Sequence, residues 1–229
     1  GSGEVTPLEL ANAFTTLAAG GQYAEPVFVR RIGEKRKEKG SSKEVLRPEV
    51  AFVVTDMMRS VVTEGTGARA AKLGITIAGK TGTSNDARDA WFIGMTQQAV
   101  VCVWVGFDDP QSLGRREGGS RTALPVFVEL AKRLKLRDRK FERPSGIIER
   151  RLDRGTGLLA AAGAPEDSIY TEVFIGGTEP SEVAPLPGQI GADQFVVDQY
   201  EQYDDGYDGY EEDGSGGGEA KRKTAPPPQ

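Results

Sequence analysis

The chain has 229 residues, a formal net charge of −5 and 38% hydrophobic residues. The negative charge gives no electrostatic reason to expect nucleic acid as a partner. The sequence contains no histidine, so Ser-His-Asp catalysis, Cys-His catalysis and histidine-ligated metal sites are excluded, and we expect neither a metal nor a cofactor. The single cysteine, Cys102, lies within the apolar run 100–104 and is expected to be a small core residue rather than a nucleophile.

The first predicted element is a helix that begins at Thr6-Pro7. Thr6 and Glu9 form a capping-box pattern with proline at the first helical position, and Gly20-Gly21 ends the helix. A strand is predicted over residues 26–32. The charged stretch that follows, residues 34–42, is expected to be a solvated hairpin loop rather than a surface for an anionic partner. The apolar face of the first helix, which begins at Thr6-Pro7, is predicted to carry Leu10, Phe14 and Leu17.

A second helix is predicted to begin at Pro48 and to end at the glycine-containing stretch 64–67. Residues 68–73 then predict a short helical segment. The buried face of the second helix is predicted from apolar residues at helical spacing, which are Val50, Val53, Val54, Met57 and Val61.

From Ile75 the apolar residues alternate, which predicts a strand. Residues 90–95 and 99–105 are two further apolar strands, close enough to pair as a hairpin through residues 96–98. Their near-continuous apolar character predicts a sheet covered on both faces. The element order predicts an α+β fold, with an antiparallel sheet flanked by helices. A closing helix is predicted to bury Ala123, Phe127, Leu130, Ala131 and Leu134.

Three regions follow from the composition. Residues 1–138 are predicted to form the main folded domain, and residues 139–187 a small irregular appendage that includes a linker at residues 142–146. Residues 188–229 carry an acidic Tyr-Asp-Gly tract and too little apolar surface to offset their ordering entropy. We therefore expect this last region to be a disordered tail.

Residues 74–81 match the phosphate-binding pattern G-x-x-x-x-G-K-[ST], and Asp108-Asp109 could hold Mg²⁺. A phosphate loop needs a turn at its variable positions and a helix that begins at the lysine. Here the variable positions, Ile-Thr-Ile-Ala, predict a strand, and the sequence after Lys80 is poor in helix formers. Since no crossover helix precedes Asp108-Asp109, a parallel βαβ unit cannot be built. A P-loop nucleotidase is therefore the least favoured function.

The stretch Lys80-Thr81-Gly82-Thr83 is instead predicted to lie at the end of a strand, on the rim of a cleft. Gly79 and Gly82 leave the backbone open to a ligand, and an edge strand can pair with an extended peptide. Lys80 supplies a positive charge, while Thr81 and Thr83 supply hydroxyls suited to a carboxylate. A free N–H near Thr83 could donate to an oxyanion.

Lys80-Thr-Gly-Thr-Ser84, followed by Asp89-Ala-Trp-Phe-Ile-Gly94, resembles the third signature of penicillin-binding transpeptidases. Over about residues 3–180 the chain resembles the C-terminal part of class A penicillin-binding proteins of the 1A type. The other segments that carry this resemblance are Val5–Ala11, Glu64-Gly-Thr-Gly67, Val105-Gly-Phe-Asp108 and Gly177-Thr-Glu-Pro180.

The resemblance implies the serine β-lactamase and penicillin-binding fold and a peptidoglycan D,D-transpeptidase. In this family a serine of an S-x-x-K motif attacks stem peptides that end in D-Ala-D-Ala, an amine resolves the acyl-enzyme, and β-lactam antibiotics acylate the same serine. Carried over, Lys80 helps to position the serine of an S-x-N motif, and Thr81 and Thr83, on either side of Gly82, bind the terminal carboxylate. The Thr83 N–H is implied to be half of the oxyanion hole.

The chain contains neither S-x-x-K nor S-x-N. The resemblance therefore implies one wall of an active site without its nucleophile. In the family both motifs, a glycosyltransferase domain and a membrane anchor come earlier in the chain, which implies these upstream parts as partners, a periplasmic location and no membrane segment here. The nearest alternative within the same fold is a serine β-lactamase fragment, which the double-threonine signature and Gly177-Thr-Glu-Pro180 disfavour. The missing nucleophile also leaves room for a non-catalytic wall-binding module.

Overall fold

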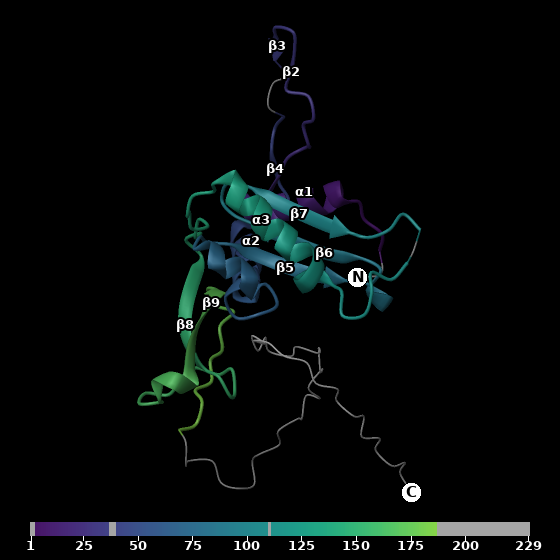
Figure 1. Cartoon of the computed structure of the whole chain (residues 1–229). Coiled ribbons are helices and arrows are strands. Elements are labelled where there is room, and N and C mark those ends of the chain that lie inside the picture. Colours follow the sequence, from purple (N-terminus) through teal and green to yellow (C-terminus); the bar gives the residue numbers. More distant parts are fainter. Residues whose placement is uncertain (1–2, 37–39, 110, 187–229) are drawn as a thin grey trace, which may run out of the picture. The chain divides into compact units, whose positions relative to one another are not determined.

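The computed structural model describes residues 3–36, 40–109 and 111–186 (Figure 1). The predicted tail at 188–229 lies outside these ranges. Helix α1 spans Pro7–Ala18, and its predicted capping box is confirmed. The Glu9 N–H donates to the Thr6 hydroxyl, and the Thr6 N–H donates to the Glu9 carboxylate at 2.9 Å. The hydrogen bonds that the Thr6 N–H and the Thr6 hydroxyl donate to the Glu9 carboxylate lower the pKa of that carboxyl.

Two small antiparallel pairs follow α1. Strand β1 (Gln22–Tyr23) pairs with β4 (Lys43–Glu44), and β2 (Arg31–Ile32) pairs with β3 (Lys35–Arg36). The strand predicted over residues 26–32 is wrong except at its last two residues. Although these residues favour strands, no neighbouring strand pairs with the first five, and strand propensity acts mainly through packing on a partner.

Helix α2 spans Pro48–Thr63, and a 3₁₀ helix, η1, spans Ala68–Leu73. The predicted buried face of α2 is wrong in phase, since Met57 is 63% exposed. The residues that are buried are Ala51, Thr55 and Val62. This face packs against strand β5, and hydrophobicity alone did not favour it over the neighbouring face that carries Val54 and Met57.

The central sheet consists of β5 (Ala78–Thr83), β6 (Ala90–Met95) and β7 (Val100–Val105), antiparallel in that order. The predicted hairpin between β6 and β7 is confirmed. Strand β5 begins three residues later than Ile75. The Thr76 N–H donates to the Asp138 carboxylate at 2.7 Å, so residue 76 takes no part in the ladder.

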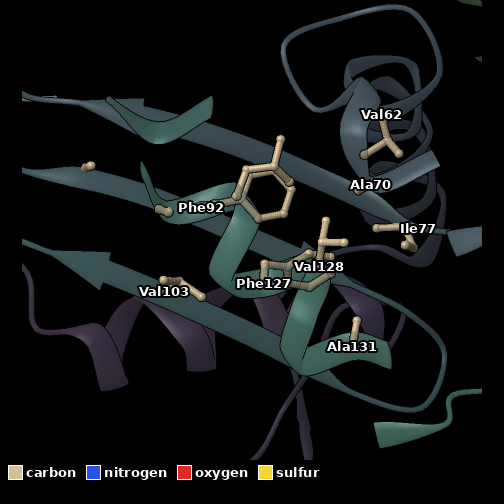
Figure 2. Packing of buried hydrophobic residues seen from close by; sticks show 11 residues of the cluster. Val62, Ala70, Ile77, Phe92, Val103, Phe127, Val128 and Ala131 are labelled. Atoms are coloured by element: carbon tan, nitrogen blue, oxygen red, sulfur yellow. The ribbon is translucent and has the colours of Figure 1, made fainter. Parts of the chain in front are cut away.

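Helix α3 spans Leu124–Leu134 and follows a π-helical turn, η3, at Gly119–Ala123. Helices α1 and α3 both pack on β6 and β7, and Figures 1 and 2 show them on opposite faces, as predicted for a sheet covered on both sides. Phe127 of α3 meets Phe92 of β6 with 4.9 Å between ring centroids (Figure 2). Leu130 and Leu134, predicted as buried, are exposed. Ala123, Phe127 and Ala131 are buried as predicted, and Leu124 and Val128 are buried as well. The bare backbone of Gly94 admits the Phe127 ring.

The segment predicted to be an irregular appendage contains a regular antiparallel pair, β8 (Ile147–Asp153) with β9 (Ile169–Ile175). Its charged residues, Glu149-Arg150-Arg151, hide the alternation that identifies a strand in a sequence. Two 3₁₀ turns complete the fold, η2 at Asn85–Ala87 and η4 at Glu166–Ser168. Within the described ranges, none of the helices has the length and apolar content required to cross a bilayer.

Candidate active site

Lys80, Thr81, Gly82 and Thr83 are the last four of the six residues of β5. Strand β5 is an edge strand, because β6 is its only strand partner in the described part of the chain. The Ser84 N–H donates to the Asp89 carbonyl at 3.0 Å. Since bonded pairs alternate in an antiparallel ladder, this contact directs the N–H groups of Thr81 and Thr83 away from β6, toward the open edge.

Strand β5 lines a hollow of about 520 Å³ beside α1, to which Lys80, Thr81, Gly82 and Thr83 all contribute. Lys80 and Gly82 pair with Ile93 and Trp91 of β6, which line the same hollow. The apolar side of this hollow is formed by Val5, Leu10, Phe14, Trp91 and Ile93. The Lys80 ammonium group is exposed and donates to the carbonyl of Thr81 at 3.0 Å. Lys80 thus lines a hollow that is apolar on one side and that also carries the carboxyl side chains of Glu4 and Asp89.

The threonine side chains are each held by a residue from outside the sheet. The Thr81 hydroxyl lies 2.8 Å from the Thr66 hydroxyl, which comes from the loop between α2 and η1. The Thr83 hydroxyl accepts a hydrogen bond from the Gly119 N–H at 3.1 Å. Sequence reasoning did not identify Thr66 or Gly119 as site residues. The motif Glu64–Gly67 was the one available signal for Thr66.

Gly119 can approach β5 this closely only because it lacks a β-carbon. A β-carbon there would lie 2.4 Å from the Trp91 carbonyl oxygen and 2.8 Å from that of Gly82. At Gly118, a β-carbon would lie 2.8 Å from the Thr83 hydroxyl oxygen. Because neither glycine has a β-carbon, the segment before α3 can pack closely against the Lys-Thr-Gly-Thr strand.

The loop between β5 and β6 is fixed through Asp89. The Asp89 N–H donates to the Ser84 hydroxyl at 2.8 Å, and the Trp104 indole N–H donates to the Asp89 carboxylate at 2.8 Å. Asp86 has the left-handed backbone conformation (φ 60°) at the tip, and the Ser112 hydroxyl donates to its carbonyl. These hydrogen bonds connect the loop that follows β5 to β7 and to the segment that contains Ser112.

The geometry contradicts the phosphate-loop interpretation. Lys80 and Thr81 lie inside a strand, and the next helical element is the three-residue turn η2. Gly74 ends η1 in the left-handed conformation and does not begin a phosphate cradle.

Burial raises the pKa of the Cys102 thiol, which disfavours the thiolate that a nucleophile requires.

Comparison with known proteins agrees with this fold. Residues 1–132 match the family described as penicillin binding protein transpeptidase domain, and residues 143–186 match the family described as penicillin-binding protein 1A, C-terminal domain. Penicillin-binding protein 1A of Pseudomonas aeruginosa is 41% identical over 147 residues, which are 62% of this chain and 18% of that protein. Penicillin-binding protein 1A of Aquifex aeolicus is 38% identical over 190 residues, which are 79% of this chain and 25% of that protein.

Among solved structures, penicillin-binding protein 1A of Haemophilus influenzae superimposes with a TM-score of 0.67 and 28% identity, over 79% of this chain and 33% of that one. The helix-flanked antiparallel sheet is thus that of the penicillin-binding protein transpeptidase domain family. The chain belongs to the penicillin-binding protein family, and within it to the 1A type. It spans about a quarter or less of the two curated relatives named above.

Proposed function

We propose that this chain supplies the substrate-carboxylate and oxyanion wall of a peptidoglycan D,D-transpeptidase, and that the nucleophile comes from a segment with S-x-x-K and S-x-N motifs. In this proposal the stem peptide, ending in D-Ala-D-Ala, lies along the open edge of β5. The Thr83 N–H donates to the oxyanion, and the Thr81 and Thr83 hydroxyls bind the terminal carboxylate. Lys80 supplies the positive potential and helps to position the S-x-N serine. β-Lactam antibiotics occupy the same place.

The observation that carries the proposal is the outward direction of the Thr81 and Thr83 N–H groups at an edge without a strand partner among the described strands. An extended peptide can pair with such an edge through main-chain hydrogen bonds. A preorganised N–H at the same edge meets the charge that develops on a carbonyl oxygen during acyl transfer. Neither function is open to a residue whose N–H is engaged in the ladder.

In this proposal the 229-residue chain alone lacks groups that acylation requires. Acylation needs an attacking hydroxyl, a base for its proton and donors for the oxyanion, and the proposed wall supplies only the donors and the carboxylate anchors. We therefore expect no covalent adduct between this chain and a fluorescent penicillin. A longer chain that includes the two serine motifs should form one. Labelling of a serine in the 229-residue chain, mapped by mass spectrometry, would contradict the proposal.

Thr83 provides the sharper test within the longer chain. Thr83→Ala should weaken acylation only partly, because the backbone donor remains. Thr83→Pro removes the N–H itself and should slow acylation by roughly 10²–10³, the effect of losing one oxyanion donor elsewhere. Equal acylation rates for Thr83→Pro and the parent would remove Thr83 from this role, whatever the outcome for the chain as a whole.

The full protein is proposed to act at the periplasmic face of the cytoplasmic membrane, with the upstream transpeptidase and glycosyltransferase parts as its partners. The match of residues 143–186 to the 1A C-terminal domain favours this over a serine β-lactamase fragment. Acylation of the longer chain distinguishes this proposal from a non-catalytic wall-binding module, which would bind peptidoglycan peptides without being acylated.

A further inference from the structure

The segment that carries β2 and β3, residues 26–36, exposes large apolar side chains that the core does not use. We call this segment the basic arm. Phe28 is 78% exposed, Ile32 is 75% exposed and Val29 is 53% exposed. Strands β2 and β3 pair only with each other among the described strands. Figure 1 shows them near the tip of a long loop that protrudes from the rest of the domain. A cluster of apolar side chains this exposed indicates a binding surface.

The same arm is strongly cationic. Four basic residues and one acidic residue, Glu34, lie between positions 28 and 36, which gives a local net charge of +3 (4 − 1 = 3). Within the described ranges none of the four cations forms an ion pair with a carboxylate. The Arg31 guanidinium donates to the carbonyl of Gly33 at 2.6 Å. The basic residues of the arm are Arg30, Arg31, Lys35 and Arg36.

Apolar and cationic side chains share one surface of the arm. An open hollow of about 610 Å³ is lined on its apolar side by Phe28, Val29 and Ile32. Arg31, Lys35 and Arg36 line the same hollow. A ligand seated there would bury hydrocarbon and meet positive charge at the same time.

We propose that the basic arm binds the surface of a membrane that contains anionic lipids. Exposed apolar side chains among cations are typical of interfacial anchors, which insert the apolar groups at the headgroup boundary and attract lipid phosphates. A specific protein interface uses about 20–30 residues from each partner, whereas the described arm has eleven residues, from Pro26 to Arg36. A fluid lipid surface needs no such complementary area. The proposal does not depend on the transpeptidase function.

Vesicle sedimentation tests the proposal with the 229-residue chain as it is. The chain should bind vesicles of equal parts phosphatidylcholine and phosphatidylglycerol, and bind pure phosphatidylcholine far more weakly. Replacing Arg31, Lys35 and Arg36 together by glutamine should weaken binding to anionic vesicles roughly a hundredfold, at about fivefold for each cation. Phe28→Ser and Ile32→Ser should each weaken it by roughly tenfold.

The control variant carries Val126→Ser and Leu130→Ser, which remove exposed apolar side chains from α3 and leave the arm intact. This variant should bind vesicles as the parent does. Three results would overturn the proposal. The parent could fail to bind anionic vesicles, or bind them equally well after the Phe28 and Ile32 changes. Light scattering could also show a dimer that Phe28→Ser dissociates, which would make a second copy of the chain the occupant.

Discussion

Replacing Gly119 by alanine tests how closely the segment before α3 must approach the Lys-Thr-Gly-Thr strand. A β-carbon at Gly119 would lie 2.4 Å from the Trp91 carbonyl oxygen, and 2.8 Å and 2.9 Å from the oxygen and nitrogen of Gly82. All three are main-chain atoms of paired strands, so no side-chain rotation relieves the contact. The Gly119 backbone must therefore withdraw, and its 3.1 Å hydrogen bond to the Thr83 hydroxyl weakens with it.

The magnitude follows from these two effects. Overpacking a closely packed position costs about 1–3 kcal/mol, and loss of one hydrogen bond adds about 0.5–1.5 kcal/mol. We expect Gly119→Ala to lower the free energy of unfolding by about 1.5–4.5 kcal/mol. In a domain of this size the melting temperature should fall by roughly 3–18 °C.

Thermal and urea denaturation of the 229-residue chain measure the effect, with Gly118→Ala as the matched variant. At Gly118 the β-carbon would meet the Thr83 hydroxyl oxygen at 2.8 Å, and this side chain can rotate away. Gly118→Ala should therefore cost less stability while displacing the same hydroxyl. A Gly119→Ala chain that melts with the parent, or a larger loss for Gly118→Ala, would refute the close-approach argument.

Three further predictions concern the core, the response to acid and the phosphate-loop motif. Gly94→Ala places a β-carbon 2.2 Å from the Phe127 ring and should cost about 1–3 kcal/mol; Phe127→Leu in the same chain should recover part of it, and additive losses in a double-mutant cycle would contradict the contact. Hydrogen bonds from Thr76, through its side chain and its N–H, lower the pKa of the Asp138 carboxyl. The stability that these hydrogen bonds contribute is present above the ordinary carboxyl pKa and is lost as the pH falls through the lowered pKa of Asp138. Asp138→Asn should therefore reduce the fall in melting temperature at acidic pH, and a variant with the same fall as the parent would contradict this prediction. ATP with Mg²⁺ should neither bind at micromolar concentration nor raise the melting temperature; a tight one-to-one calorimetric titration would restore the phosphate loop.

The sequence predicted those parts of the fold and site that depend on neighbours in the chain. The hairpin of β6 and β7 follows from two apolar runs separated by a short turn, and the Lys80–Thr83 strand is one contiguous motif. The partners of its threonines were not predictable in this way. Thr66 is 15 residues from Thr81, and Gly119 is 36 residues from Thr83. Only the folded topology brings them together.

Helix phase was the second limit. Met57 and Leu130 are apolar residues at acceptable helical spacing, and each helix carries enough apolar residues to support two faces. The buried face is decided by what packs against it, such as the Phe127 ring over Gly94, and this choice is absent from any local pattern. The basic arm shows the same limit, because its strand-forming residues have no partner strand outside the arm among the described strands.

The open edge of β5 has a consequence for solubility as well as for ligands. A strand with unpaired N–H groups is a template on which a second copy of the chain can pair, and extended edges of this kind lead to aggregation. Strand β5 holds two glycines, which disfavour strand pairing, and one lysine, whose charge repels an identical edge. Lys80 would then keep copies of the protein apart at the edge where we propose that a peptide binds, so an apolar residue at this position would favour self-association even where no substrate is present.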